Sequence, residues 1–250
     1  MTDAVRAEDL TVTFGSRVAL DAVSFAVPLA TTAAVIGPNG SGKSTLLRTI
    51  AGLLAPSSGS VAVPARRSPG GIALVLQSTE LDAGLPLSVR EAVRMARYRR
   101  MGLVRRFGAA DREAVDAAIE RLELTALVGR QLGELSGGQR QRVLVAQGLA
   151  QEADLLLLDE PLTGLDLASR IRILSIIDEE RSAGRTVLVS THDLGDARRC
   201  DLVLVVSTRL VAFGPPAVAL AAGPLREAYG ARVVHLDEDT LLLDDPHHHH

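Results

Sequence analysis

Residues 37–45 read GPNGSGKST, and this stretch decides the fold. The segment from Gly37 to Ser44 fits the pattern G-x-x-x-x-G-K-S/T. An apolar run of strand length, TAAVIG (32–37), precedes it, and STLLRTIAGL (44–53) is predicted as a helix. Strand, glycine-rich loop and helix are the context in which this pattern cradles phosphates, because glycines turn successive backbone N–H groups inward and the helix directs its positive end at the same place.

Lys43 is the only lysine in a chain that holds 27 lysine and arginine residues. An ammonium is a compact charge with three rotatable donors, whereas a guanidinium is a wide planar fork, and a cradle of backbone amides has room only for the first. One contact with a phosphate is worth on the order of 4 kcal/mol at about 4 Å and an effective dielectric of roughly 20. We expect Lys43 to reach the outer phosphates of a nucleotide and Ser44 to bind Mg²⁺.

The composition of the chain limits the classes of protein and of partner that fit it. The chain has 250 residues, 47% of them hydrophobic, 23% charged, with a net charge of −3. This balance does not favour nucleic-acid binding through bulk charge, and we expect no nucleic-acid partner. The single cysteine, Cys200, excludes an internal disulfide and fits a reducing compartment. The polar start shows no signal peptide, and no apolar run reaches the ~18 residues of a membrane span.

Apolar runs alternate with helical patterns along the chain. Strands are predicted at LTVTF and VSFAV within 9–27 around a turn at Gly15, and at 32–37, 72–77, 155–159, 185–190 and 202–206. A helix is predicted over 168–184. Strands that alternate with helices indicate a mostly parallel sheet with helices on both faces.

The section from about 78 to 135 lacks strand signals and is predicted as a helical insertion. Ser88 and Glu91 have the spacing of a capping box, and Asp111 is expected to cap a second helix. Three apolar residues fall on one face of that second helix: Val115, Ile119 and Leu122.

Two carboxylates, Asp159 and Glu160, follow the buried strand in LLLLDEP. At the carboxyl edge of a sheet, such a pair suits Mg²⁺ and water chemistry. Asp159 would hold Mg²⁺, and Glu160 would orient and deprotonate the attacking water, a role worth ~10²–10⁴ in rate. Taken alone, the pair is as readily a solvated strand edge.

Three weaker signals accompany these carboxylates. The segment LSGGQRQR (135–142) places Ser136 at a helix start, where it is an N-cap and where glycines let an anion approach the amides. Gln77 ends a strand, where a polar side chain reaches metal or water, and His192 in STHD could contact a γ-phosphate. In isolation these three are better read as a helix cap, a strand terminus and a structural histidine.

In this order, the glycine-rich loop, Gln77, LSGGQ, LLLLDEP, TGLD and STHD resemble the ATP-binding subunit of ABC transporters over nearly all of residues 5–220. The resemblance implies a P-loop NTPase (RecA-like) α/β fold: a mostly parallel sheet, a small antiparallel β subdomain and a helical insertion subdomain. It implies an ATPase domain over 1–235, with about 78–135 inserted, and an acidic, histidine-containing tail over 236–250.

The resemblance also assigns roles. ATP and Mg²⁺ are the implied cofactors. The implied catalytic residues are Glu160, His192 and Gln77, and the implied Mg²⁺ ligands are Ser44, Gln77 and Asp159. The implied ATP-binding residues are Phe14, which would stack on adenine, Gly37, Pro38, Asn39, Gly40, Ser41, Gly42, Lys43, Ser44 and Thr45. For Phe14, core packing is the alternative.

A second copy of the chain is implied as well. Ser136, Gly137, Gly138, Gln139 and Asp166 resemble residues that contact ATP bound by the partner subunit. In the family, one chain's P-loop faces the other chain's LSGGQ segment across a head-to-tail dimer. We therefore expect ATP to close a homodimer and hydrolysis to open it.

The segment QSTELDAGLPLSVREAVRMARYRRMGL (77–103) and GPPAVAL (214–220) are most similar to subunits of zinc and manganese importers. This implies integral membrane permease subunits, an extracytoplasmic metal-binding protein in the same system, and a peripheral location on the cytoplasmic side of the cell membrane. Another cargo, export, or a soluble ATP-gated clamp are the alternatives. A clamp usually carries two cassettes or a long coiled-coil insertion, and this chain has neither.

Two charged segments leave more than one interpretation. Seven arginines lie within 90–106: Arg90, Arg94, Arg97, Arg99, Arg100, Arg105 and Arg106. They form either a solvated helix face, the more common case, or a surface near the permease and anionic headgroups. The histidines at 247–250 beside Asp244 and Asp245 could bind Zn²⁺ or be a tag remnant.

Overall fold

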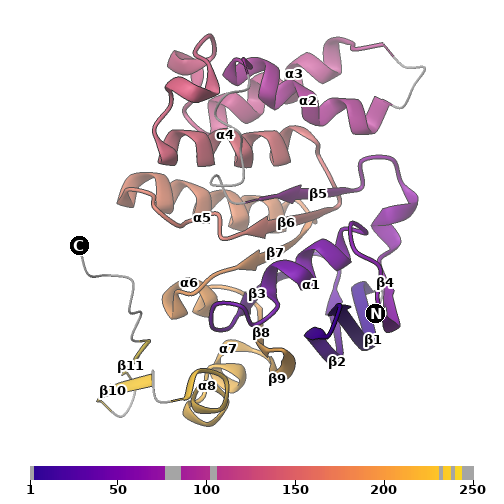
Figure 1. Ribbon diagram of the computed structural model, residues 1–250. Coiled ribbons are helices and arrows are strands. Elements are labelled where there is room, and N and C mark those ends of the chain that lie inside the picture. The colour runs from indigo at the N-terminus through magenta and orange to yellow at the C-terminus, as the bar shows by residue number, and fades with distance from the viewer. Residues whose placement is uncertain (1–2, 77–85, 102–105, 231–232, 238–239, 244–250) are drawn as a thin grey trace.

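The computed structural model describes residues 3–76, 86–101, 106–230, 233–237 and 240–243 (Figure 1). Its larger sheet has six strands: β3 (Thr32–Ile36), β5 (Ile72–Val75), β6 (Leu155–Asp159), β7 (Thr186–Ser190), β8 (Leu202–Ser207) and β9 (Arg209–Gly214). Their order is β5-β6-β7-β3-β8-β9, and all neighbours run parallel except β9, which is antiparallel to β8. The predicted mostly parallel sheet is confirmed.

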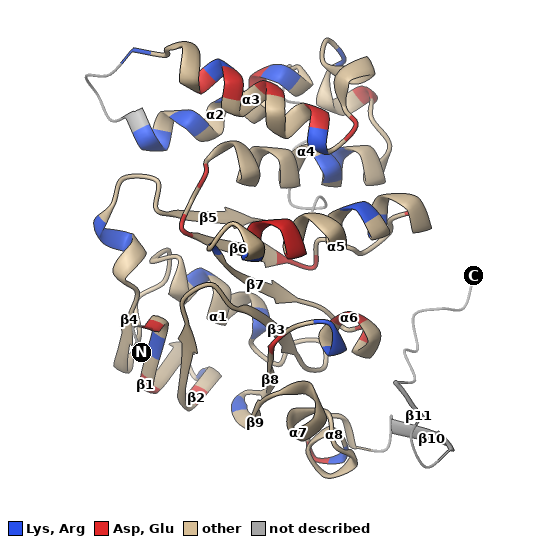
Figure 2. Ribbon diagram, turned by 180° about the vertical axis from the view of Figure 1, so that it is seen from behind, with Lys and Arg blue, Asp and Glu red and all other residues tan. Residues whose placement is uncertain are grey.

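The central strands are mostly apolar, with polar residues only at their ends, because both faces of the sheet are covered. Every residue of β3, β6 and β7 is buried. Alternate residues of β3 face opposite sides: Ala34 and Ile36 join one hydrophobic cluster, and Ala33 and Val35 join the other. Figure 2 shows the consequence, since Lys, Arg, Asp and Glu lie mainly on the helices and loops around this sheet.

A smaller antiparallel sheet lies beside one face of the main sheet. It has the order β2-β1-β4, built from β1 (Asp3–Phe14), β2 (Arg17–Pro28) and β4 (Ser58–Ala62). The turn expected at Gly15 joins β1 to β2, and Gly15 has a positive φ of 59° there. Helix α1 (Lys43–Ile50) packs against the same cluster through Leu46, Leu47 and Ile50.

The other face carries most of the helices (Figure 1). They are α2 (Val89–Met101), α3 (Ala109–Arg121), α4 (Gly137–Ala150), α5 (Leu167–Ser182) and α6 (Leu194–Arg198), and α7 (Pro216–Ala219) and α8 (Ala222–Tyr229) lie near β8 and β9. Short 3₁₀ helices cover Pro64–Arg67, Thr125–Leu127 and Leu132–Glu134. Helices α2, α3 and α4 pack on one another beyond β5, and each helix of the described residues is too short or too polar to cross a membrane.

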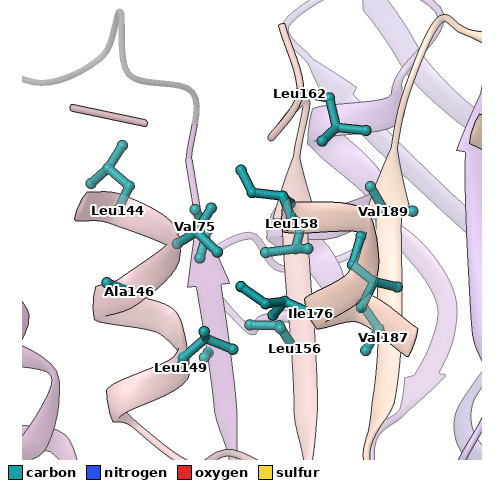
Figure 3. Packing of buried hydrophobic residues seen from close by; sticks show 14 of the residues in the cluster. Val75, Leu144, Ala146, Leu149, Leu156, Leu158, Leu162, Ile176, Val187 and Val189 are labelled. Carbon is teal, nitrogen blue, oxygen red and sulfur yellow. The ribbon is translucent and has the colours of Figure 1, made fainter. Parts of the chain in front are cut away.

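Close packing joins α4 to the sheet (Figure 3). The apolar side chains in this layer include Val75, Leu144, Ala146, Leu149, Leu156, Leu158, Ile176, Val187 and Val189. Gly148 sets the approach, because a Cβ there would lie 2.5 Å from Cγ2 of Val75 and 3.3 Å from Cδ1 of Leu156. The absence of a side chain at this position lets α4 lie directly on β5 and β6.

Two local predictions are tested in the insertion. The capping box is confirmed: the backbone N–H of Ser88 donates to Glu91 at 2.8 Å, and that of Glu91 donates to the Ser88 hydroxyl at 3.3 Å. The prediction for Asp111 is wrong, because α3 begins two residues earlier and Gly108 is its N-cap. Asp111 lies in the first turn, where its carboxylate accepts from the Gly108 N–H at 2.9 Å.

A two-stranded hairpin of β10 (Val233–Asp237) and β11 (Thr240–Leu243) spans the expected boundary at residue 235. The division into a domain over 1–235 and a tail over 236–250 stays a prediction. Gln77, Arg105 and the four terminal histidines lie outside the described residues.

Candidate nucleotide-binding and hydrolysis site

The glycine-rich loop lies between β3 and α1. Gly42 is the N-cap of α1 with a φ of 104°, and a Cβ there would lie 2.6 Å from the Ala19 carbonyl oxygen and 2.7 Å from Cδ2 of Leu20. A side chain at this position would collide with β2, so only glycine fits. The loop is fastened at Ser41, whose N–H donates to the Pro38 carbonyl at 3.1 Å and whose carbonyl accepts from Thr208 at 2.9 Å.

A pocket of about 260 Å³ opens over this loop. Eleven residues line it: Phe14, Arg17, Ala19, Asn39, Gly40, Ser41, Gly42, Lys43, Ser44, Thr45 and Glu160. The structure therefore brings together Phe14, most of the loop and Glu160, which are far apart in the sequence. Phe14 is 51% exposed, so its ring is a free apolar surface at the pocket and not part of the core.

Lys43 lies inside the loop, with 6% of its surface exposed. Its Nζ donates to the carbonyl oxygens of Gly37 at 2.8 Å and Pro38 at 3.3 Å. Burial lowers the pKa of Lys43, while the carboxylates of Glu160 and Asp159 act in the opposite direction. The ammonium is thus held in position between the loop and the acidic pair.

Ser190 joins the acidic pair to the neighbouring strand. Its hydroxyl donates to Oδ1 of Asp159 at 2.6 Å and accepts from the backbone N–H of Glu160 at 2.9 Å. Asp159 is the last residue of β6 and is 4% exposed, so its carboxylate is fixed. No pattern in the sequence singled out Ser190, because the contact crosses from β7 to β6.

Glu160 has a left-handed backbone with a φ of 48°. A non-glycine residue in this region costs on the order of 1–3 kcal/mol, so the surrounding structure must enforce it. Its carboxylate lies between three polar side chains: Oε1 is 4.0 Å from Nζ of Lys43, while Oε2 accepts from Thr163 at 3.3 Å and is 4.0 Å from Nδ1 of His192. The predicted water-activating residue is thereby aimed at the phosphate loop.

Arg170 of α5 holds the backbone segment that carries His192. Its Nη2 donates to Asp193 at 2.6 Å and to Asp196 at 2.8 Å, and Asp193 caps α6 by accepting from the Asp196 N–H at 3.0 Å. Burial alone would raise the pKa of Asp193, but Arg170 and backbone donors lower it. Burial, and then Asp193, raise the pKa of Asp196 against the effect of Arg170.

The LSGGQ segment begins α4. Ser136 is the N-cap: its hydroxyl accepts from the Gln139 N–H at 3.3 Å, and its own N–H donates to the Gln139 side chain at 3.1 Å. Gly138 lies against Leu165, where a Cβ would approach Cδ2 to 3.3 Å. Ser136 and Gly137 are exposed, and no residue of the segment lines the pocket over the P-loop.

Helices α1 and α4 pack into the two different clusters on opposite faces of the sheet (Figure 1). A single chain therefore does not bring its own LSGGQ segment to its own P-loop. Asp166 lies at the exposed start of α5, where it accepts from the N–H and the hydroxyl of Ser169, both at 2.9 Å. These hydrogen bonds lower its pKa, and its neighbour Leu167 is 73% exposed.

Two features of the site fit a bound nucleotide with a cation. The Ser41 hydroxyl is buried in the loop and lacks a hydrogen-bond partner among the described residues. Ser44 on the first turn of α1 and Asp159 supply a hydroxyl and a carboxylate, which are the oxygen ligands that Mg²⁺ prefers. His, Cys, Asp and Glu side chains of the described residues form no separate cluster suited to a metal ion.

A glycine-rich loop after β3, a buried lysine and an acidic pair at the end of β6 define a P-loop nucleoside triphosphatase. The family model described as ABC transporter matches residues 20–163. This chain belongs to the ABC transporter family as an ATP-binding cassette, which binds ATP or ADP and is an ATPase.

Known relatives match almost the whole chain. It is 38% identical over 246 residues to the chelated iron transport system membrane protein YfeB of Yersinia pestis, covering 95% of this chain and 83% of that protein. It is 36% identical over 241 residues to the manganese transport system ATP-binding protein MntB of Bacillus subtilis (strain 168), covering 95% and 96%. It is 38% identical over 234 residues to the zinc transport system ATP-binding protein TroB of Treponema pallidum (strain Nichols), covering 92% and 88%.

Solved structures agree with this assignment. A chain of an ABC transporter assigned to the metal-chelate type, in an inward-facing conformation, has a TM-score of 0.81 and 27% identity, with 96% of both chains covered. The ATP-binding cassette MJ0796, in a dimeric post-hydrolysis state with ADP and Pi, has a TM-score of 0.74 and 25% identity, with 85% and 98% covered.

Proposed function

We propose that this chain hydrolyses ATP to drive an importer of a transition metal or a metal chelate, with manganese and zinc as the first cargoes to test. The observation that carries the proposal is the set of relatives above. The three belong to iron, manganese and zinc transport systems and match 92–95% of this chain at 36–38% identity. The chain would act on the cytoplasmic side of the membrane as a peripheral subunit.

The pocket over the P-loop is proposed to hold ATP. Residues 37–45 would surround the phosphates with backbone donors, and the Lys43 ammonium would move from the carbonyls of the loop to phosphate oxygens. Phe14, at the pocket with its ring exposed, would stack on the base. Ser44, Asp159 and Gln77 would hold Mg²⁺, which supplies charge neutralisation at the β- and γ-phosphates.

Glu160 is proposed as the residue that orients the attacking water. Its Oε2 is within hydrogen-bonding distance of Thr163 and 4.0 Å from His192, so a water near this carboxylate would have partners on both sides. The left-handed backbone of Glu160, fixed through Ser190, keeps the carboxylate facing Lys43. His192 would contact the γ-phosphate from the end of β7.

A head-to-tail homodimer is proposed to complete the site. Ser136 and Gly137 of the LSGGQ segment are exposed, and the segment starts a helix on the opposite face of the sheet from α1. A second copy is therefore needed to place the amides of Ser136 to Gln139 and the carboxylate of Asp166 at the γ-phosphate. The dimeric state of the similar cassette MJ0796 supports this arrangement.

A second pocket is proposed to receive the membrane-spanning partner. It has a volume of about 320 Å³ and lies between β5, α2 and α4. Its lining includes Leu53, which is 54% exposed, and Met95, which is 47% exposed. Exposed apolar side chains around a groove are typical of an interaction site. This groove borders α4, the helix that begins in the LSGGQ segment.

Reconstitution tests the function. The chain is placed in vesicles with its permease, and ATP-dependent uptake of Mn²⁺, Zn²⁺ and chelated iron is measured, with Glu160→Gln as the inactive control. Uptake of at least one metal by the parent chain and of none by the variant supports the proposal. If the chain hydrolyses ATP but none of the metals stimulates hydrolysis and none is taken up, the proposed metal cargo is contradicted. The assignment of the chain as an ATPase would still hold.

A further inference from the structure

The arginines of the segment 90–106 are not all exposed. Arg97 is 3% exposed, and its guanidinium donates to Asp111 at 3.0 Å and to the Ala150 carbonyl at 2.8 Å. These two hydrogen bonds connect α2 to α3 and to the end of α4. Arg90 and Arg94 lie nearer the start of the same helix, seven and three residues before Arg97, and both are exposed.

Two of the arginines in this segment and a third from α3 line one pocket on the outside of the insertion. Arg90 and Arg94 come from α2, Arg112 comes from α3, and Phe107 and Val115 complete the lining. The pocket has a volume of about 260 Å³, and none of its lining residues is acidic. It shares no residue with the pocket over the P-loop.

An aromatic ring holds one of the cations in position. The guanidinium carbon of Arg94 lies 4.1 Å from the centre of the Phe107 ring. Stacking on a ring occupies one face of a guanidinium and leaves its N–H edge available. Because the ring restricts the side chain, less conformational entropy is lost when those N–H groups bind a ligand.

The charges in this pocket are only partly neutralised. Arg90 is bonded to Asp116 at 2.5 Å, with both side chains about half exposed (51% and 56%). Within the described residues, Arg94 and Arg112 have no carboxylate in ion-pair distance, and Glu91 next to Arg94 is bonded to Ser88. The pKa of Glu91 is lowered mainly by hydrogen bonds from Ser88 and least by the charge of Arg94, so most of the positive charge of Arg94 and Arg112 is left over.

We propose that this pocket binds a phosphate group. Two guanidinium groups without an ion-pair partner among the described residues match the charge of a phosphate dianion, and guanidinium N–H pairs match phosphate oxygens geometrically. The half-exposed setting implies moderate affinity that falls with ionic strength. The site is separate from the nucleotide and belongs to the insertion, whose α2 and α3 pack on the LSGGQ helix α4.

The phosphate has two possible sources: a soluble phosphorylated compound or the headgroup of an anionic lipid. The first arm of the test uses inorganic phosphate, titrated into the full chain while a non-hydrolysable ATP analogue and Mg²⁺ fill the P-loop. Arginine side-chain NMR signals report binding. We expect Arg94→Gln and Arg112→Gln each to raise the dissociation constant about tenfold or more.

Two further variants separate a built pocket from general charge attraction. Arg67→Gln removes another exposed arginine outside this pocket and is expected to leave the dissociation constant unchanged. Phe107→Leu keeps every charge but removes the ring, and about a two- to fivefold rise is expected. Equal effects of Arg67→Gln and Arg94→Gln, or an absence of saturable binding, would overturn the proposal. Unchanged ATP hydrolysis verifies that each variant is folded.

The second arm measures cosedimentation with vesicles of phosphatidylcholine alone or mixed with phosphatidylglycerol. If Arg94→Gln weakens both phosphate binding and binding to the anionic vesicles, the headgroup is the ligand. If only phosphate binding weakens, the ligand is soluble. Vesicle binding that responds to neither Arg94→Gln nor Arg112→Gln, together with no phosphate binding, refutes the site.

Discussion

The ammonium of Lys43 and the carboxylate of Glu160 lie 4.0 Å apart, although the two residues come from different strand–loop segments of the sheet. The two residues lie close together because β3 and β6 are the two neighbours of β7 and run parallel to it. Their carboxyl ends therefore lie at the same edge of the sheet. The proposed phosphate-binding group and the proposed water-orienting group are thus positioned by the same edge of the sheet.

Replacement of Lys43 should abolish tight nucleotide binding. Lys43→Ala removes a buried charge with two carbonyl partners, and we expect ATP affinity to fall at least about 30-fold, since a charged hydrogen bond contributes roughly 2 kcal/mol or more. Lys43→Arg should bind almost as weakly, because the buried position has no space for a planar fork. Calorimetry with Arg67→Ala as the control measures this, and undiminished affinity would refute the role of Lys43.

Removal of the Glu160 charge should separate binding from hydrolysis. We expect Glu160→Gln to lower phosphate release by ~10²–10⁴ while ATP still binds, because an amide cannot accept the proton of the attacking water. ATP should then accumulate in a closed dimer. Gel filtration at saturating Mg–ATP is the second measurement, with Glu120→Gln, an exposed glutamate of α3, as the control. A monomer under these conditions would contradict the dimer model.

The local motifs could be located from the sequence because each depends on a few consecutive residues, and the roles proposed for them stay predictions. The P-loop, the acidic pair and the LSGGQ cap each occur within one turn or one strand end, and the structure places them at those positions. The order of these motifs implied the fold class, and the alternation of mostly apolar strands with helices predicted the mostly parallel sheet.

Contacts between distant segments were not predictable in this way. Ser190 and Arg170 reach their partners across 31 and 23 positions in the sequence. Strand β9 was missed, because its residues are half-buried and it pairs antiparallel at the sheet edge. Arg97 looked like one more solvated arginine, since nothing near it in the sequence marks Ala150 as its partner.

Arg170 should act as a positioning residue for His192. In Arg170→Ala, Asp193 and the buried Asp196 lose their shared cation, so we expect kcat to fall about tenfold with little change in KM for ATP, and stability to fall by roughly 1–3 kcal/mol. Arg170→Lys should restore part of kcat. Steady-state kinetics and urea unfolding measure both effects. An unchanged kcat in a destabilised variant would show that the contact is only structural.

Gly148 should reject a side chain because of its contact with β5. Gly148→Ala places a methyl group 2.5 Å from Val75, and this overpacking, about 1–3 kcal/mol, should outweigh the gain of about 1 kcal/mol in helix propensity. The double variant Gly148→Ala/Val75→Ala removes the opposing methyl groups. It should be more stable than the sum of the two single effects predicts, as measured by urea unfolding. Strict additivity would mean that α4 moves away from the sheet.

The thiol of Cys200 should be unreactive in the folded chain. It is 7% exposed, and burial, with a smaller effect of Asp201, raises its pKa from the ordinary value of 9.0 to about 12. Because Cys200 is the sole cysteine, a chromogenic disulfide reagent reports on this site alone. At pH 8 we expect labelling at least about a hundredfold slower than in denaturant. The raised pKa also means that the unfolded chain loses this proton first, so stability should fall as the pH rises from about 9 towards 12. Cys200→Ala is the control: its stability should lack that part of the alkaline decline, and rapid labelling of the native chain would show that the thiol is open to solvent.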